Sequence, residues 1–163
     1  MDPRIVPLSH ILRLNTRLLR NCLDGMSDDA AALRPSPTMN NAAFIAAHCG
    51  DARYYLLRLL GVELDNPFAP YLAGARSIDD VAQLPSLAVI REAWTSASHA
   101  LRDCLEALSS DEVRRQVPNA PAFPGTDKSV LSMLTFLVQH ESYHLGQIAL
   151  LRRYAGLPAM NYD

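Results

Sequence analysis

The chain has 163 residues, of which 49% are hydrophobic and 20% charged, and 15 basic against 17 acidic residues give it a formal charge of -2. This length predicts one domain, 1–163, whose core needs neither a disulfide nor a structural metal. Because the charge balance supplies no positive field for a phosphate backbone, we expect no nucleic-acid partner.

The expected location follows from the cysteines and from the absence of long apolar stretches. Cys22, Cys49 and Cys104 are odd in number and form no C-x-x-C pair, unlike a secreted disulfide framework or a cysteine-rich zinc module. The arginine-rich N-terminal residues lack the apolar stretch of a signal peptide. Uncharged stretches such as 129–139 are shorter than the roughly 20 apolar residues of a membrane span. We therefore expect a cytoplasmic protein without a membrane partner.

The eleven prolines lie at the edges of, or between, four segments with apolar residues at helical spacing. The first predicted helix, about 8–24, ends at Gly25, with arginines on its outer face. Its inner face is predicted to carry Leu8, Ile11, Leu12, Leu18, Leu19 and Cys22. The second predicted helix, about 40–60, has Asn40 or Asn41 as its cap and ends at Gly61.

The third predicted helix, about 86–109, begins at Ser86 and has Trp94 and Leu101 on its inner face. The fourth, about 128–155, ends at Gly156. No strand or hairpin pattern appears, so the predicted class is all-α, a four-helix bundle. About 25 residues separate the second and third helices, including a predicted short helix at 77–84. This long link favours a crossover that leaves those two helices parallel.

Three histidines fall on faces that are otherwise apolar. His140 and His144 are one turn apart on the inner face of the fourth helix, where two ring nitrogens can converge on one metal. His48 faces inward from the second helix, so that a metal is the simplest common partner for the three imidazoles. The alternative for each is a core histidine bonded to a backbone carbonyl or a hydroxyl.

The other two histidines, one cysteine and two glycines have structural explanations. His10 and His99 are expected on solvent-facing positions, and Cys49 is expected to be buried and unreactive. Gly50 and Gly146 each follow a histidine by two residues, which indicates either close helix packing or room for a ligand.

Two segments resemble the DinB-like family: HCGDARYYLLRLLG at 48–61 and HESYHLGQIALLRRYAG at 140–156. The resemblance lies in a lone histidine on the second helix, an H-x-x-x-H pair, a following G-Q and a later L-R. It implies an up-down-down-up bundle, a divalent metal held by His48, His140 and His144, and a homodimer. Assigned relatives include thiol-dependent transferases and isomerases, among them maleylpyruvate isomerases. In related sulfoxide synthases the motif reads H-x-x-x-H-x-E, whereas this chain has Gly146 at the last position.

Two other metalloenzyme classes share part of the pattern. The string HESYH matches the H-E-x-x-H motif of zinc peptidases, in which the glutamate, here Glu141, is the general base. The downstream metzincin ligand is missing, because Gln147 and Leu150 occupy the glycine and histidine positions. A di-iron centre needs two Glu-x-x-His units, and only Glu141 with His144 fits.

The metal site, together with the resemblance, predicts a metal-dependent hydrolase or thiol transferase that acts on a small molecule, and the resemblance implies a low-molecular-weight thiol as a second partner. Three histidines and an open fourth position favour zinc, with nickel, manganese and iron as alternatives. Glu141, Tyr143, Gln147 and Tyr55 are the candidate catalytic or substrate-contact residues. The competing hypothesis is a non-catalytic helical interaction protein with a vestigial or structural metal site.

Overall fold

The structure, a computed structural model, describes residues 1–118, 120 and 127–162. Its four long helices are α1 (Val6–Leu23), α3 (Ala42–Leu59), α5 (Leu87–Ala107) and α7 (Val130–Tyr154). Their ends lie within two residues of those predicted from the sequence. The all-α prediction is confirmed.

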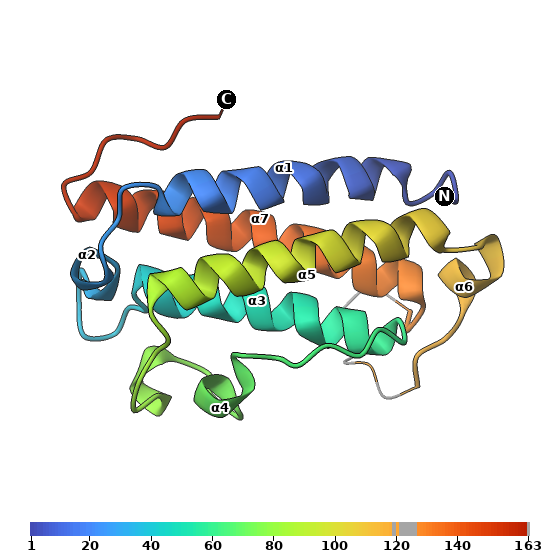
Figure 1. Cartoon of the computed structure of the whole chain (residues 1–163), viewed down its shortest axis with the longest axis horizontal. Helices are drawn as coiled ribbons and strands as arrows, with labels where there is room; N and C mark the ends of the chain where they lie inside the picture. Colours follow the sequence, from blue (N-terminus) through green and yellow to red (C-terminus); the bar gives the residue numbers. More distant parts are fainter. Residues whose placement is uncertain (119, 121–126, 163) are drawn as a thin grey trace.

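The four helices form a bundle with an up-down-down-up order (Figure 1). α1 and α7 run in one direction, and α3 and α5 run in the other. Each helix packs against two others, so that α1 and α3 lie diagonally opposite and each contacts both α5 and α7. The long link between α3 and α5 crosses the bundle, as its length predicted.

Local signals set the ends of the long helices. Asn41 caps α3 by accepting a hydrogen bond from the Phe44 amide at 2.8 Å, and Ser86 and Ser129 cap α5 and α7 in the same way. After α7, Gly156 has a φ of +80°, a left-handed conformation in which a side chain is strained. Asn40 and Asn41 were both predicted as possible caps of α3, and the structure uses Asn41.

Three short helices were not predicted: α2 (Asp28–Ala32), α4 (Ala69–Leu72) and α6 (Ser110–Arg114). Each is four or five residues long, too short to show an apolar period. The helix predicted at 77–84 is wrong in length. Only a 3-10 turn, Ile78–Asp80, forms there. Ser77 and Asp80 form a capping box around this turn, and the turn ends because the next residue, Val81, has an extended backbone.

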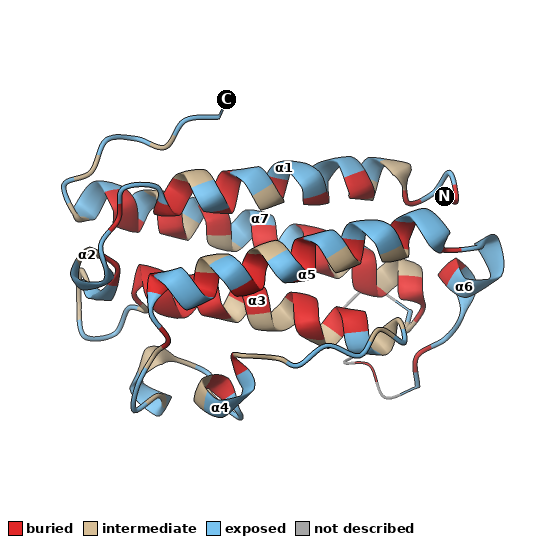
Figure 2. Ribbon diagram, in the orientation of Figure 1, coloured by how far each residue is buried: buried red, intermediate tan, exposed pale blue. Residues whose placement is uncertain are grey.

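The core lies between the four long helices, where their inward faces meet (Figure 2). Trp94 and Leu101 of α5 are at most 2% exposed, as predicted from the sequence. Ile11, predicted to face inward, is 38% exposed. It lies at the edge of the buried face of α1, whose centre is marked by Leu12 and Leu19. Along the described part of the chain, every helix falls short of the length and apolarity that a membrane crossing requires.

Candidate metal centre

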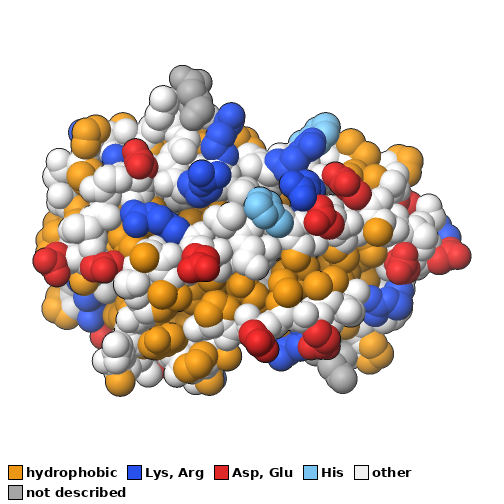
Figure 3. All heavy atoms as spheres, in the orientation of Figure 1, with side chains coloured by type: hydrophobic (Ala, Val, Ile, Leu, Met, Phe, Trp, Pro, Cys, Tyr) orange, Lys and Arg blue, Asp and Glu red, His pale blue; other side chains and the backbone are white. Residues whose placement is uncertain are grey.

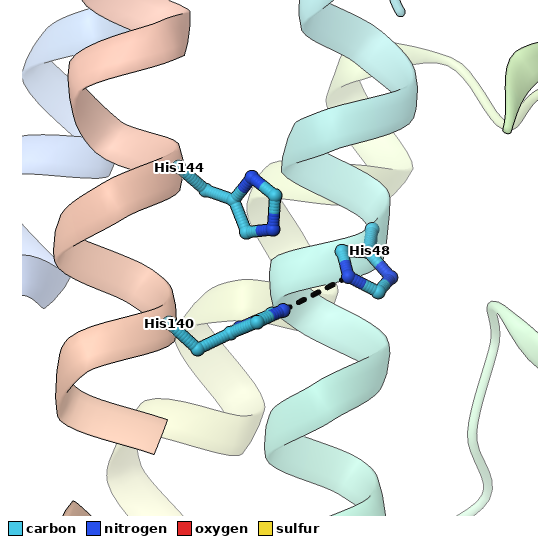
Figure 4. A group of neighbouring side chains, drawn as sticks. All are labelled: His48, His140 and His144. Carbon is cyan, nitrogen blue, oxygen red and sulfur yellow. Dashed lines mark hydrogen bonds between the residues drawn. The ribbon is translucent and has the colours of Figure 1, made fainter. Parts of the chain in front are cut away.

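The three histidines predicted as ligands come together at the contact between α3 and α7. His48 lies in α3, while His140 and His144 lie one turn apart in α7, and the three rings point toward one another (Figure 4). Because α3 and α7 are antiparallel neighbours, the middle of each helix reaches the same level of the bundle. The tertiary contact therefore joins residues that are 92 positions apart in sequence.

The spacing of the ring nitrogens suits a single small cation. The Nε2 atoms of His48 and His140 are 2.9 Å apart, and one nitrogen from each of the three rings lies within 4.8 Å of the other two. With metal–nitrogen bonds of about 2.1 Å, tetrahedral coordination places ligand nitrogens about 3.4 Å apart. The observed separations, from 2.9 Å up to at most 4.8 Å, span that distance.

The surroundings of His48 and His140 favour the neutral imidazole, which is the form that binds a metal. Burial, together with the neighbouring His48 and His144, lowers the pKa of His140 to about 3. Burial is also the main cause that lowers the pKa of His48. The two facing Nε2 atoms have only each other as partners, and the buried Nδ1 of His140 has no hydrogen-bond partner among the described residues. The set of three imidazole donors fits a divalent transition metal.

Gln147 fixes which nitrogen of His144 is available to a metal. The Oε1 atom of Gln147 lies 2.6 Å from Nδ1 of His144. Since an amide oxygen only accepts hydrogen bonds, Nδ1 carries the proton and Nε2 presents its lone pair. The Nε2 atom of Gln147 in turn donates to the Tyr143 hydroxyl at 3.3 Å, and that tyrosine is 59% exposed.

A cavity of about 320 Å³ opens beside His48 and His140, between α3 and α7. Asp51 and Tyr55 also line it, and the rest of its wall is apolar. Of the candidate substrate-contact residues, Tyr55 is therefore the one that lies on this cavity.

Glu141 lies away from both the histidine cluster and the cavity. Its side chain is 1% exposed, and its two oxygens accept hydrogen bonds from Arg53 at 2.6 and 2.9 Å. Asn15 donates a further hydrogen bond to Oε2 at 3.2 Å. With its oxygens engaged in the core, Glu141 has no access to a bound substrate. Its candidate role as a general base or substrate contact stays a prediction, and the buried ion pair with Arg53 disfavours it.

Arg53 and Asn15 were not predicted as buried residues, although they are 1% and 2% exposed. Arg53 shares a heptad face with Ala46, Gly50 and Leu57, all of them buried, and that spacing is the signal that could have identified it. Its guanidinium carbon also lies 3.6 Å from the centre of the Trp94 ring.

The structure also shows the surroundings of the other histidines, of Cys49 and of the two glycines inside the helices. His10 and His99 are exposed, and the face over α1 and α5 carries arginine, acidic and histidine side chains interspersed (Figure 3). Cys49 is fully buried, which raises the pKa of its thiol well above the ordinary value. Gly50 is explained by packing, because the Phe68 ring occupies the space of a Cβ atom there. At Gly146 nothing lies within 4 Å of that position.

Comparisons with known proteins agree with this arrangement. The model of the DinB superfamily matches residues 11–148. The fold is similar to a DinB-like protein from Bacillus cereus, with a TM-score of 0.68, 19% identity and 91% of each chain covered. It is also similar to a conserved protein from Enterococcus faecalis, with a TM-score of 0.77, 13% identity and coverage of 95% of this chain and 98% of the other. The comparison with curated proteins finds no match.

Proposed function

Since the chain belongs to the DinB superfamily, we propose that His48, His140 and His144 bind one divalent metal ion that takes part in a reaction on a small molecule. The observation that carries the proposal is the convergence of three imidazoles beside a cavity. The donor type favours zinc, and nickel, manganese and iron also suit imidazole nitrogen.

A divalent metal held by three imidazoles lowers the pKa of a water or thiol in its open position, which supplies a nucleophile near neutral pH. The protein's own residues provide the setting. His48 and His140 form the end of the cavity where a substrate would meet the metal, and Gln147 keeps Nδ1 of His144 protonated. Tyr55 lines the same cavity and is the polar side chain best placed to contact a bound substrate.

The reaction classes that fit this setting are metal-dependent hydrolysis and thiol transfer, the second with a low-molecular-weight thiol as co-substrate. Family resemblance supports a homodimer as the working unit. Peptide hydrolysis is disfavoured, because Glu141 is held by Arg53 inside the core.

The first test measures the metal content of the protein and the contribution of the Gln147–His144 hydrogen bond to zinc affinity. Purified protein that is stripped of metal and then dialysed first against zinc and afterwards against zinc-free buffer is expected to retain one metal per chain. Replacing Gln147 with Leu removes the hydrogen bond that orients His144 and should weaken zinc binding by about 10- to 100-fold. The exposed Gln139, in the same helix, provides the matched control Gln139→Leu, which should bind zinc as the parent does.

A screen of thiol-transfer and ester substrates with the zinc-loaded protein then distinguishes an enzyme from an interaction protein. Turnover that requires metal and is lost in His144→Ala supports the proposal. Zinc binding without turnover of any thiol-transfer or ester substrate would favour the non-catalytic alternative. Failure of the protein to retain metal would contradict the metal site itself.

A further inference from the structure

We propose that the cavity beside His48 and His140 selects an uncharged, largely apolar small molecule with a metal-binding group at one end. This inference deepens the proposed function and rests on it for the metal-binding end of the ligand. The selection against anions rests on the cavity walls alone.

The walls of the cavity are apolar on both helices that form it. Beyond its histidine end the lining comprises Ala52, Leu56 and Leu59 of α3 and Met133, Phe136 and Leu137 of α7. A ligand that fills this space exchanges water for aliphatic and aromatic contacts, which favours an apolar body. Its volume, about 320 Å³, suits a small molecule rather than a chain or a folded partner.

The charge on the walls has one sign. Asp51 is the only charged side chain that lines the cavity among the described residues. Its Oδ1 accepts a hydrogen bond from Asn66 at 2.6 Å, which holds the carboxylate in the wall. An anionic group on the ligand body, away from the metal, would therefore lose its hydration, gain no cationic side chain as a partner and face a fixed carboxylate.

Arg58 and Arg115, whose contacts lie beside the cavity, do not line it. Arg58 lines the adjoining cavity on the other side of Tyr55, and its guanidinium lies 5.6 Å from the centre of that ring. Arg115 donates a hydrogen bond to the Leu59 carbonyl oxygen at 3.1 Å and is absent from the cavity lining. A carboxylate on the ligand body would consequently have no guanidinium to bind inside the cavity.

The test compares two aromatic thiols of nearly equal shape on the zinc-loaded protein, by isothermal titration calorimetry. 4-Methylbenzenethiol carries a methyl group where 4-mercaptobenzoate carries a carboxylate, and both offer the same thiol to the metal. We expect the methyl compound to bind at least about tenfold more tightly, because a carboxylate buried without a partner loses more than that in affinity. Equal binding, or tighter binding of 4-mercaptobenzoate, would overturn the proposal.

A variant that adds a positive charge to the wall shows whether the cavity itself makes the selection. Leu59→Arg places a cation in the half-buried wall and should reduce the preference for the methyl compound at least severalfold. Leu150→Arg adds the same charge at a side chain that is 63% exposed and outside the cavity, and should leave the preference unchanged. A preference that stays the same in Leu59→Arg, with thermal unfolding showing a folded protein, would place the selection elsewhere and refute the proposal.

A metal-free arm separates this inference from the proposed function. In protein labelled with ¹³C at the methionine methyl groups, p-xylene should shift the resonance of Met133, assigned with Met133→Leu, whereas 4-methylbenzoate should not. A shift with p-xylene in protein that binds no zinc would refute the metal site and keep the apolar selection. No shift with p-xylene, or equal shifts with both compounds, would refute the selection whatever the metal does.

Discussion

Replacing Glu141 with Gln should destabilise the protein severely while leaving the histidine cluster in place. The substitution keeps the shape of the side chain but leaves the Arg53 guanidinium without its counter-charge at a site where both side chains are 1% exposed. Removing one partner of a buried ion pair costs roughly 3–5 kcal/mol. At about 2–4 °C per kcal/mol for a chain of this length, the melting temperature should fall by roughly 6–20 °C.

The loss is large because the ion pair belongs to a network that joins all four long helices. Arg53 of α3 also donates to the Thr16 hydroxyl of α1 at 2.8 Å, and it contacts Ser98 and Trp94 of α5, while Glu141 lies in α7. A double variant, Arg53→Met with Glu141→Met, should recover much of the stability, since it leaves no buried charge unpaired.

Differential scanning calorimetry measures the effect, and Glu106→Gln, an exposed glutamate of α5, is the control. A melting temperature of Glu141→Gln within about 2 °C of the parent, a shift that corresponds to less than about 1 kcal/mol, would refute the burial argument. Zinc binding should persist in the folded variant. Peptide hydrolysis that is present in the parent and lost in Glu141→Gln would instead revive the peptidase hypothesis.

Two further predictions concern packing and pH. Gly50→Ala should lower the free energy of unfolding by about 1–3 kcal/mol, because the new Cβ atom meets the Phe68 ring. Gly146→Ala, with open space around the new Cβ atom, should raise it by about 0.5–1 kcal/mol. Urea unfolding of the two variants checks that the changes have opposite signs. Burial raises the pKa of Cys22 to about 11 and that of Cys49 well above its ordinary value. The protonated thiols therefore contribute their full stability below pH 9, and this contribution is lost as the pH rises toward 11. Unfolding midpoints that fall equally from pH 7.5 to 10.5 in the parent and in a Cys22→Ala, Cys49→Ala variant would contradict the second prediction.

The sequence predicts the four long helices well because each carries an apolar stripe several turns long and ends at a cap, a glycine or a proline. The separation between the second and third helices also predicts the crossover and the parallel pair α3 and α5. The short helices escape prediction because one turn shows no period. Ile11 was assigned inward because periodicity alone gives the same weight to the edge and the centre of a face.

The histidine cluster was predictable because imidazoles on apolar faces are unusual, and the helical period fixes where each one points. The burial of Glu141 was not predictable, because a position 100° from His140 can face either solvent or another helix, and the sequence does not say which helix lies there. The answer depends on Arg53, a charged residue whose partner is 88 positions away, and no local pattern links the two. The cavity likewise exists only through the packing of α3 on α7.

The central claim, one metal held across α3 and α7, is tested most directly by the zinc affinity of His48→Ala beside that of His99→Ala. His48 lies 92 residues from His140, and only the three-histidine site gives it a role in binding metal. Losing one of three ligands should weaken zinc binding by more than the roughly 10- to 100-fold expected when only a supporting hydrogen bond is lost, while the bundle stays folded. His99→Ala, at an exposed position of α5, should bind zinc as the parent does. If His48→Ala bound zinc as tightly as the parent while His144→Ala did not, the three-histidine site would be wrong.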